Sequence, residues 1–88
     1  MAVRLVTYDI ADGDSDDYEE LHDAIKEYEH HHLQKSVWLI DTSESSKAVF
    51  DTLKAHLSDD DDLFVVRLRK GWWSTKGRKW LKSDERTW

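Results

Sequence analysis

Residues 2–10, AVRLVTYDI, decide the fold, because they predict a strand around which the other elements can be placed. The stretch is rich in β-branched and aromatic residues and carries a single charge before Asp9, at Arg4, which is the composition of a buried strand. The apolar run stops at Asp9, and more aspartates follow it: Asp12, Asp14, Asp16 and Asp17. Either these carboxylates form a metal site, or they cap and solubilise a helix.

The next segment has the spacing of an amphipathic helix. From residue 16 to about residue 29 the apolar residues recur every three or four positions, which gives one stripe that faces a core. The stripe contains Tyr18, Leu21, Ala24, Ile25 and Tyr28. Ser15 or Asp16 is the expected N-cap, and Glu19, three residues after Asp16, completes a capping box.

Two short strands are predicted after this helix, at 30–34 (HHHLQ) and 36–42 (SVWLIDT), with a tight turn near Lys35. A single bent strand fits the same residues almost as well. Within the first strand His30 and His32 share a face and could hold one metal ion. Because this segment is expected at a sheet edge, polar side chains that discourage edge pairing explain the histidines as well.

A second helix is expected at about 44–57, capped by Thr42 or Ser43. Its apolar face consists of Val49, Phe50, Leu53 and Leu57. After the acidic stretch SDDDD, residues 63–69 (LFVVRLR) predict the last strand. The alternation of this strand places Phe64, Val66 and Leu68 on one face, and Val65, Arg67 and Arg69 on the other.

The order of elements is βαββαβ followed by a tail, which predicts an α+β, ferredoxin-like fold. In that fold a four-stranded antiparallel sheet is covered on one face by two helices. We assign residues 1–70 to this domain and residues 71–88 to a basic, Trp-rich C-terminal tail that docks on the sheet or on a dimer partner. The first strand lies between the third and the fourth, so Asp9 is expected near Ser36 and near two residues of the later acidic stretch, Asp61 and Asp62.

The composition limits the class of protein. A chain of 88 residues forms one domain, and the absence of cysteine rules out disulfides and thiolate metal sites. No apolar run approaches the ~18 residues that span a bilayer, so we expect a cytoplasmic protein without a membrane partner. Residues 1–62 hold five Lys or Arg against 17 Asp or Glu, whereas residues 63–88 hold eight against two. The acidic part should repel nucleic acid, and the basic part should attract phosphate or the acidic part of another subunit.

Three stretches resemble a known family in their order and spacing. They are the opening strand that ends in YDI, the LQKSVW segment at 33–38, and the acidic run at 59–62 that precedes LFVVRL. In these features the chain resembles CRISPR-associated protein two, a family of small adaptation nucleases, over residues 3–68. The toxin-like virulence-associated protein D group shares this fold and is a close second match.

The resemblance implies a homodimer in which the aspartate that closes the first strand of each subunit faces its mate and holds a divalent metal for phosphodiester cleavage. In this sequence that aspartate is Asp9, expected as catalytic residue and metal ligand, and Ser36 is the supporting serine of the second motif. An oxygen-only site with room for water suits Mg²⁺ or Mn²⁺. The chain departs from the family on the first helix, where basic residues are usual and this sequence has GDSDDYEELHD, and at Trp38, where phenylalanine is usual.

In the tail, tryptophans alternate with Lys and Arg residues, and this pattern is compatible with two functions of the tail. It can stack bases and hold phosphates, as single-strand binders do, or it can dock on the other subunit, as the C-terminal segment of the family often does. Because four exposed indoles would reduce solubility, we favour docking. The residues expected to contact nucleic acid or the dimer partner are Arg67, Arg69, Lys70, Trp72, Trp73, Arg78 and Lys79.

Two functions therefore remain open. The first is a divalent-metal-dependent endonuclease that acts on RNA or DNA as a homodimer, which the YDI and QKSVW stretches favour. The second is a non-catalytic dimeric scaffold that binds another protein, which the acidic first helix favours.

Overall fold

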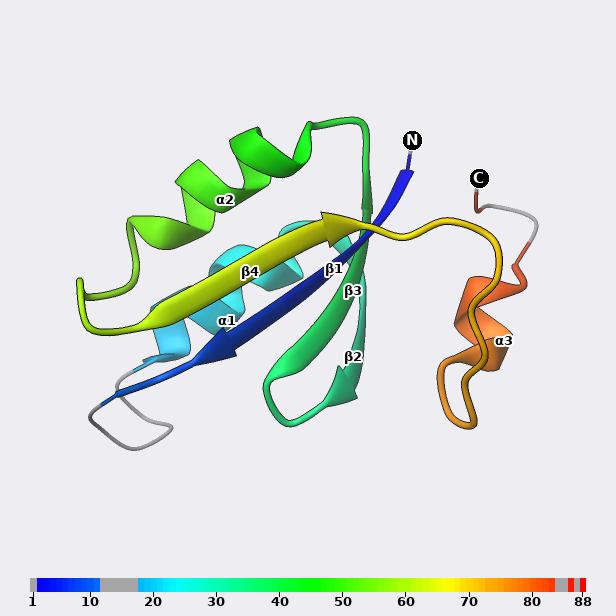
Figure 1. Cartoon of the computed structure of the whole chain (residues 1–88), viewed down its shortest axis with the longest axis horizontal. Helices are drawn as coiled ribbons and strands as arrows, with labels where there is room; N and C mark the ends of the chain where they lie inside the picture. The colour runs from blue at the N-terminus through cyan, green and yellow to red at the C-terminus, as the bar shows by residue number, and fades with distance from the viewer. Residues whose placement is uncertain (1, 12–17, 84–85, 87) are drawn as a thin grey trace.

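The computed structural model describes residues 2–11, 18–83, 86 and 88. Its elements are β1 (Ala2–Asp9), α1 (Glu19–Lys26), β2 (Glu29–Gln34), β3 (Val37–Thr42), α2 (Ser46–Lys54), β4 (Asp62–Arg67) and α3 (Arg78–Leu81). The strands form one antiparallel sheet in the order β2-β3-β1-β4 (Figure 1). The predicted α+β, ferredoxin-like fold is confirmed. None of the helices in the described ranges is long and apolar enough to cross a membrane.

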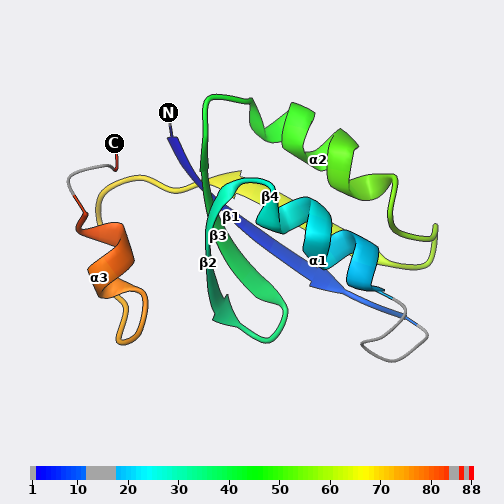
Figure 2. The same cartoon turned by 180° about the vertical axis from the view of Figure 1, so that it is seen from behind.

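The helices α1 and α2 cover one face of the sheet, as Figure 2 shows from behind. Since side chains alternate along a strand, β1 sends Val6 and Tyr8 into the core beneath the helices, and β3 sends Trp38 and Ile40. The helices, β4 and the residue before α1 complete this core with Tyr18, Leu21, Ile25, Val49, Leu53 and Leu63. The apolar stripes seen in the sequence are therefore the surfaces by which α1 and α2 pack.

The C-terminal tail packs on the opposite face of the same sheet. Leu81 of α3 is buried with Val3 of β1 and Leu39 of β3. Partly buried apolar side chains surround these three: Leu5, Leu33, Leu68, Trp72, Trp80 and Trp88. The tail therefore forms a second, smaller core with the sheet of its own chain.

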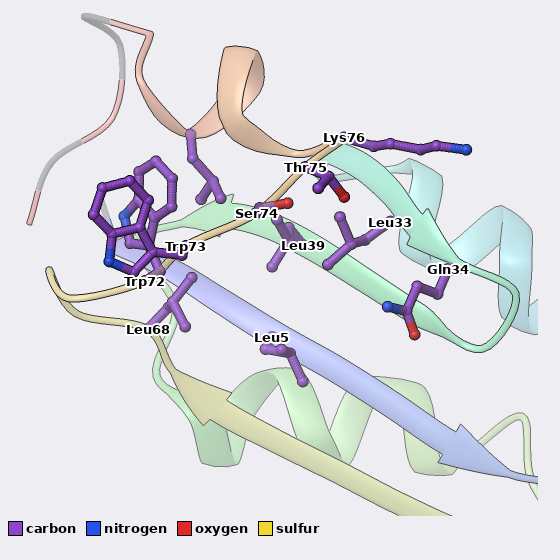
Figure 3. A pocket seen from close by; sticks show the side chains of 11 residues that line it. Leu5, Leu33, Gln34, Leu39, Leu68, Trp72, Trp73, Ser74, Thr75 and Lys76 are labelled. Atoms are coloured by element: carbon purple, nitrogen blue, oxygen red, sulfur yellow. The ribbon is translucent and has the colours of Figure 1, made fainter.

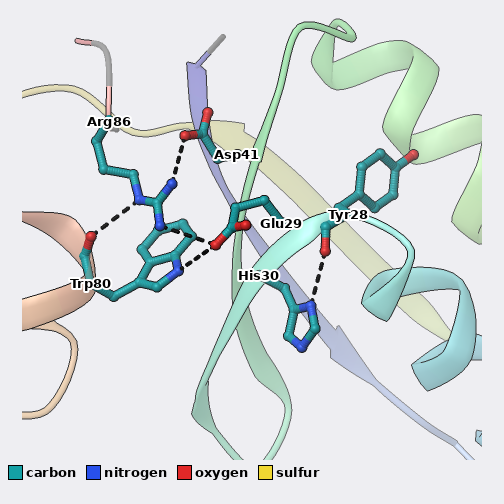
Figure 4. Close-up of polar contacts among 6 residues, drawn as sticks. All are labelled: Tyr28, Glu29, His30, Asp41, Trp80 and Arg86. Atoms are coloured by element: carbon teal, nitrogen blue, oxygen red, sulfur yellow. Dashed lines mark hydrogen bonds and ion pairs between the residues drawn. The ribbon is translucent and has the colours of Figure 1, made fainter. Parts of the chain in front are cut away.

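Arg86 holds the end of the tail against the sheet (Figure 4). Its guanidinium donates to the carboxylate of Asp41 on β3 at 3.0 Å and to that of Glu29 on β2 at 3.2 Å. It also lies over the Trp80 ring, 3.7 Å from the ring centroid, and its Nε donates to the Trp80 carbonyl. The Asp41 side chain has no exposed surface, so this ion pair compensates a carboxylate that would be costly to bury alone.

The two separate strands predicted after the first helix are confirmed. β2 and β3 pair in antiparallel register, with an irregularity between His32 and Gln34. β2 is an edge strand, as expected. The helix α1 begins at Glu19 among the described residues, and its expected N-cap, Ser15 or Asp16, lies outside them.

The predicted cap of the second helix is wrong. The N-cap of α2 is Ser45, whose hydroxyl accepts the N–H of Ala48 at 3.0 Å. The hydroxyl of Thr42 accepts the N–H of Glu44 instead, at 3.1 Å, which stabilises the turn that leaves β3. The short helix α3 was not predicted, because its four residues are too few to show a helical period.

Candidate functional site

Asp9 ends β1 at the rim of the sheet, where its side chain is exposed. Its register partner on β4 is Asp62, which is also exposed. Residues that pair directly across two strands project from the same face, and this is the face opposite α1 and α2, because the neighbouring Tyr8 and Leu63 point into the helix-side core. The topology predicted this approach of the first strand to the later acidic stretch, and the register confirms it.

The Asp9 and Asp62 carboxylates have no cationic partner among the described residues. Within the described ranges, no ion pair to Lys, Arg or His involves either of them. Like charges directly opposite each other across two strands are destabilising. A cation bound between the two carboxylates would remove that repulsion.

Asp61, by contrast, has a structural role. Its carboxylate accepts the N–H of Ser58 at 2.9 Å and the N–H of Ala11 at 3.0 Å. These two backbone hydrogen bonds, with Ser58 first, lower the pKa of Asp61 below its ordinary value. Asp61 therefore ties the end of β1 to the turn before β4.

Ser36 lies in the turn between β2 and β3. Its carbonyl accepts the N–H of Tyr8 at 3.3 Å, so its backbone lies beside the residue that precedes Asp9. Among the described residues, no hydrogen bond joins the Ser36 hydroxyl to Asp9. The contact between this turn and the rim is thus made by the backbone.

The histidines of β2 pack against aromatic rings. His32 stacks on Trp38 with 3.7 Å between ring centroids, and His30 lies 5.7 Å from the same ring. His31 points to the other face, where it stacks on Trp80 at 6.0 Å. In the part of the chain that the structure describes, no group of three or more His, Asp or Glu could hold a metal ion. Counting the described residues alone, a metal site within one chain would therefore rest on two carboxylates.

Sequence reasoning missed a polar cluster on the helix-covered face of the sheet, formed by Tyr8, His22 and Trp38. The Tyr8 hydroxyl is hydrogen-bonded to His22 Nε2 at 2.7 Å and accepts the indole N–H of Trp38 at 3.4 Å. Sequence reasoning also missed the burial of Arg4, whose guanidinium donates to the Glu44 carbonyl at 2.8 Å. The signal for Arg4 was present, since it is the single charge within the apolar run of β1 before Asp9.

The predicted contact residues of the tail are spread over two faces. Arg67 shares the face of Leu63 and Val65, on which the helices pack, so it projects away from the tail. Trp72 and Trp73 border a hollow of about 810 Å³ between the tail and the sheet (Figure 3). Four exposed cations complete the predicted set: Arg69, Lys70, Arg78 and Lys79.

An apolar strip remains uncovered beside this hollow. Phe64 and Val66 of β4 are 57% and 39% exposed, and they pair in register with Thr7 and Leu5 of β1. The strip lies on the tail side of the sheet, as Asp9 and Asp62 do. One surface thus combines exposed apolar side chains with the pair of acidic residues.

The fold and this surface define a small ferredoxin-like protein with an acidic sheet rim and an open apolar face. The family model described as CRISPR associated protein Cas2 matches residues 1–76. Because this match covers most of the chain, the protein belongs to the CRISPR associated protein Cas2 family.

Proposed function

We propose that this member of the Cas2 family is a divalent-metal-dependent endonuclease that cuts RNA or DNA as a homodimer. The observation that carries the proposal is the direct pairing of Asp9 with Asp62 on the face that also exposes Phe64. The carboxylates supply metal ligands, and the apolar side chain supplies a contact for a second copy. Together they give one half of a site that a dimer would complete.

The dimer is supported by the uncovered strip on β4. Exposed apolar side chains that lie next to one another on a small protein mark an interaction surface. A twofold dimer uses the same patch on both subunits, so packing through Phe64 and Val66 would bring the two sheet faces together. The Asp9 residues of the two subunits would then lie on facing surfaces.

The ligand types fit a hard divalent cation. Mg²⁺ binds oxygen ligands, keeps several waters and is often held by one or two carboxylates together with substrate phosphates. Asp9 and Asp62 would hold Mg²⁺ or Mn²⁺ in this way, while Asp61 is engaged with two backbone N–H groups. When bound, such an ion supplies an activated water and neutralises charge on the leaving oxygen.

Cleavage tests this proposal directly. Labelled single- and double-stranded RNA and DNA are incubated with the protein and Mg²⁺, Mn²⁺ or chelator. We expect metal-dependent cutting that Asp9→Asn and Asp62→Asn reduce to the level seen with chelator. Asp51→Asn, which changes an exposed carboxylate on α2, is the matched control and should cut as the wild type does. Full activity in Asp9→Asn would refute the proposed ligand.

The dimer requires its own measurement. Multi-angle light scattering should give the mass of two chains for the wild type and of one chain for Phe64→Ser. Phe64 is more than half exposed, so its replacement should change the melting temperature of the subunit little. A wild type that scatters as a monomer at assay concentration would contradict the shared site.

A non-catalytic dimeric scaffold is the second candidate. It is favoured by the acidic surface of α1, where Glu19, Glu20 and Asp23 are exposed and would repel nucleic acid. A scaffold would use this surface to bind another protein. A dimer in light scattering that cuts none of the four substrates with either metal would support the scaffold over the nuclease.

A further inference from the structure

The docked tail has a second side that faces solvent. Trp80 and Leu81 point toward the sheet, where Leu81 is 2% exposed and the Trp80 indole donates to Glu29 at 3.3 Å. Trp73 is different, because 87% of its surface is exposed. Docking accounts for the other tail tryptophans, which are partly buried, and leaves the exposure of this indole unexplained.

A pocket of about 310 Å³ opens beside Trp73. Two further indoles border it, Trp72 and Trp88, whose rings lie 6.0 Å apart at an angle of 33°. Its volume is at the lower end of the range for small-molecule sites, which is about 300–1,000 Å³. Figure 3 shows Trp72 and Trp73 next to each other at the end of the hollow between tail and sheet. The pocket thus has aromatic walls and a size suited to a single heterocyclic base.

The same pocket is bordered by cations. Lys70, Arg78 and Lys82 line it, and all three are exposed. None of them takes part in an ion pair with another described residue, in contrast to Arg86. Residues 63–83 contain seven Lys or Arg and no Asp or Glu, and Asp84 and Glu85 follow them, so this part of the chain is strongly basic. An anion that approaches these three cations is attracted by them.

We propose that this solvent-facing side of the tail is a binding site for single-stranded nucleic acid. An unpaired base stacks on Trp73 beside Trp72, and the backbone phosphates lie against Lys70, Arg78 and Lys82. Stacking platforms flanked by cations bind single strands in this way, without a requirement for sequence. A duplex fits less well, because its bases are already stacked on one another.

The site is separate from the acidic rim and does not rest on the proposed cleavage. The site also gives a role to the uneven charge of the chain. The acidic body of the protein repels nucleic acid, whereas the basic tail attracts it. A contact between two copies through the same patch would bring two sets of cations together, which disfavours the tail pocket as the dimer interface.

Fluorescence anisotropy of labelled oligonucleotides tests the site. Single-stranded decamers of DNA and RNA and the corresponding duplex are titrated with the full chain in chelator, which prevents cutting. We expect the single strands to bind more tightly than the duplex, and Trp73→Ala to weaken their binding about tenfold or more. Lys70→Ala and Lys82→Ala should each weaken binding and lower the slope of log affinity against log salt by about 0.7. Trp73→Ala should leave that slope unchanged.

Matched controls distinguish this site from a general attraction between charges and from a dimer contact. Lys26→Ala removes an exposed cation from α1 and should bind as the wild type does. Asp9→Asn should also bind normally, so loss of cleavage and loss of tail binding are independent results. Displacement of the oligonucleotide by polyglutamate at an equal concentration of charge would overturn the proposal in favour of a general contact for acidic proteins. Conversion of Trp73→Ala to a monomer in light scattering would overturn it in favour of a dimer contact.

Discussion

His22 projects from α1 into a group of aromatic side chains, and its surroundings favour the neutral ring. Burial is the largest cause that lowers its pKa below the ordinary value of 6.5, and the nearby His32 and Lys26 lower it further. Asp23 and Glu19 act in the opposite direction but do not cancel the effect. The hydrogen bond to the Tyr8 hydroxyl places this ring against β1, so its protonation should disturb the contact between α1 and the sheet.

The protein should therefore lose stability as the pH falls below 6.5. A lowered pKa means that the unfolded chain binds a proton more tightly than the folded chain does, so the contribution of His22 is complete above 6.5 and is lost on acidification below it. Urea unfolding at several pH values between 8 and 5.5 measures this effect. His22→Gln should flatten the dependence. An equal slope in His22→Gln would contradict the assignment.

At the scale of the elements, the repeating patterns of the sequence predicted strands and helices well, and the cap of α2 poorly. Hydrophobic patterns located β1, β3, α2 and β4, because each pattern extends over several residues and reports burial. The cap of α2 was misplaced because three hydroxyl residues, Thr42, Ser43 and Ser45, are candidates within four positions. The choice among them depends on backbone geometry after β3, which the sequence pattern does not contain.

The tail passes close to β2 at Gly77, where there is little room for a side chain. A Cβ at Gly77 would lie 2.9 Å from Leu33 Cδ1 on β2 and 2.9 Å from the Ser74 hydroxyl oxygen, which accepts the Gly77 N–H. Because both atoms end side chains that can rotate, Gly77→Ala should displace Leu33 and Ser74, loosen the tail against β2 and cost about 1 kcal/mol, the lower end of the range for overpacking. Limited proteolysis, read by mass spectrometry, should show faster cutting after the tail lysines in this variant.

Thr75→Ala provides the control for this experiment, because it changes an exposed side chain in the same loop. It should be cut at the wild-type rate. If Gly77→Ala were cut no faster than Thr75→Ala, the Leu33 side chain would have moved aside without loosening the tail.

At the scale of the whole molecule, the strand order predicted the acidic rim of the sheet. The packing of the tail, in contrast, could not be predicted from the sequence and is seen only in the three-dimensional structure. The approach of Asp9 to Asp62 follows from a strand order that local patterns fix. The tail is held by contacts between residues far apart in the chain, such as Arg86 with Asp41, and no local period signals them. Sequence reasoning likewise could not tell which indole faces solvent, because Trp72 and Trp73 are neighbours in the same basic run.

A chain without the tail should aggregate. Ending the chain after Lys70 would expose Val3 and Leu39, which are 0% and 1% exposed in the full chain, next to Phe64 and Val66, which are already exposed. The resulting apolar surface would extend across β3, β1 and β4, and a continuous patch of this kind promotes aggregation. Loss of Arg86 would also leave Asp41 without its ion-pair partner.

Static light scattering of the truncated chain, at several concentrations, measures this outcome. We expect large aggregates at concentrations where the full chain stays soluble. A truncated chain with Leu39→Thr and Val3→Thr should scatter less, because the newly exposed surface is then more polar. A truncated chain that stays soluble and melts at the full-length temperature would mean that the sheet does not need the tail. In that case the packing of Leu81 against Val3 and Leu39 would hold the tail in position without stabilising the domain.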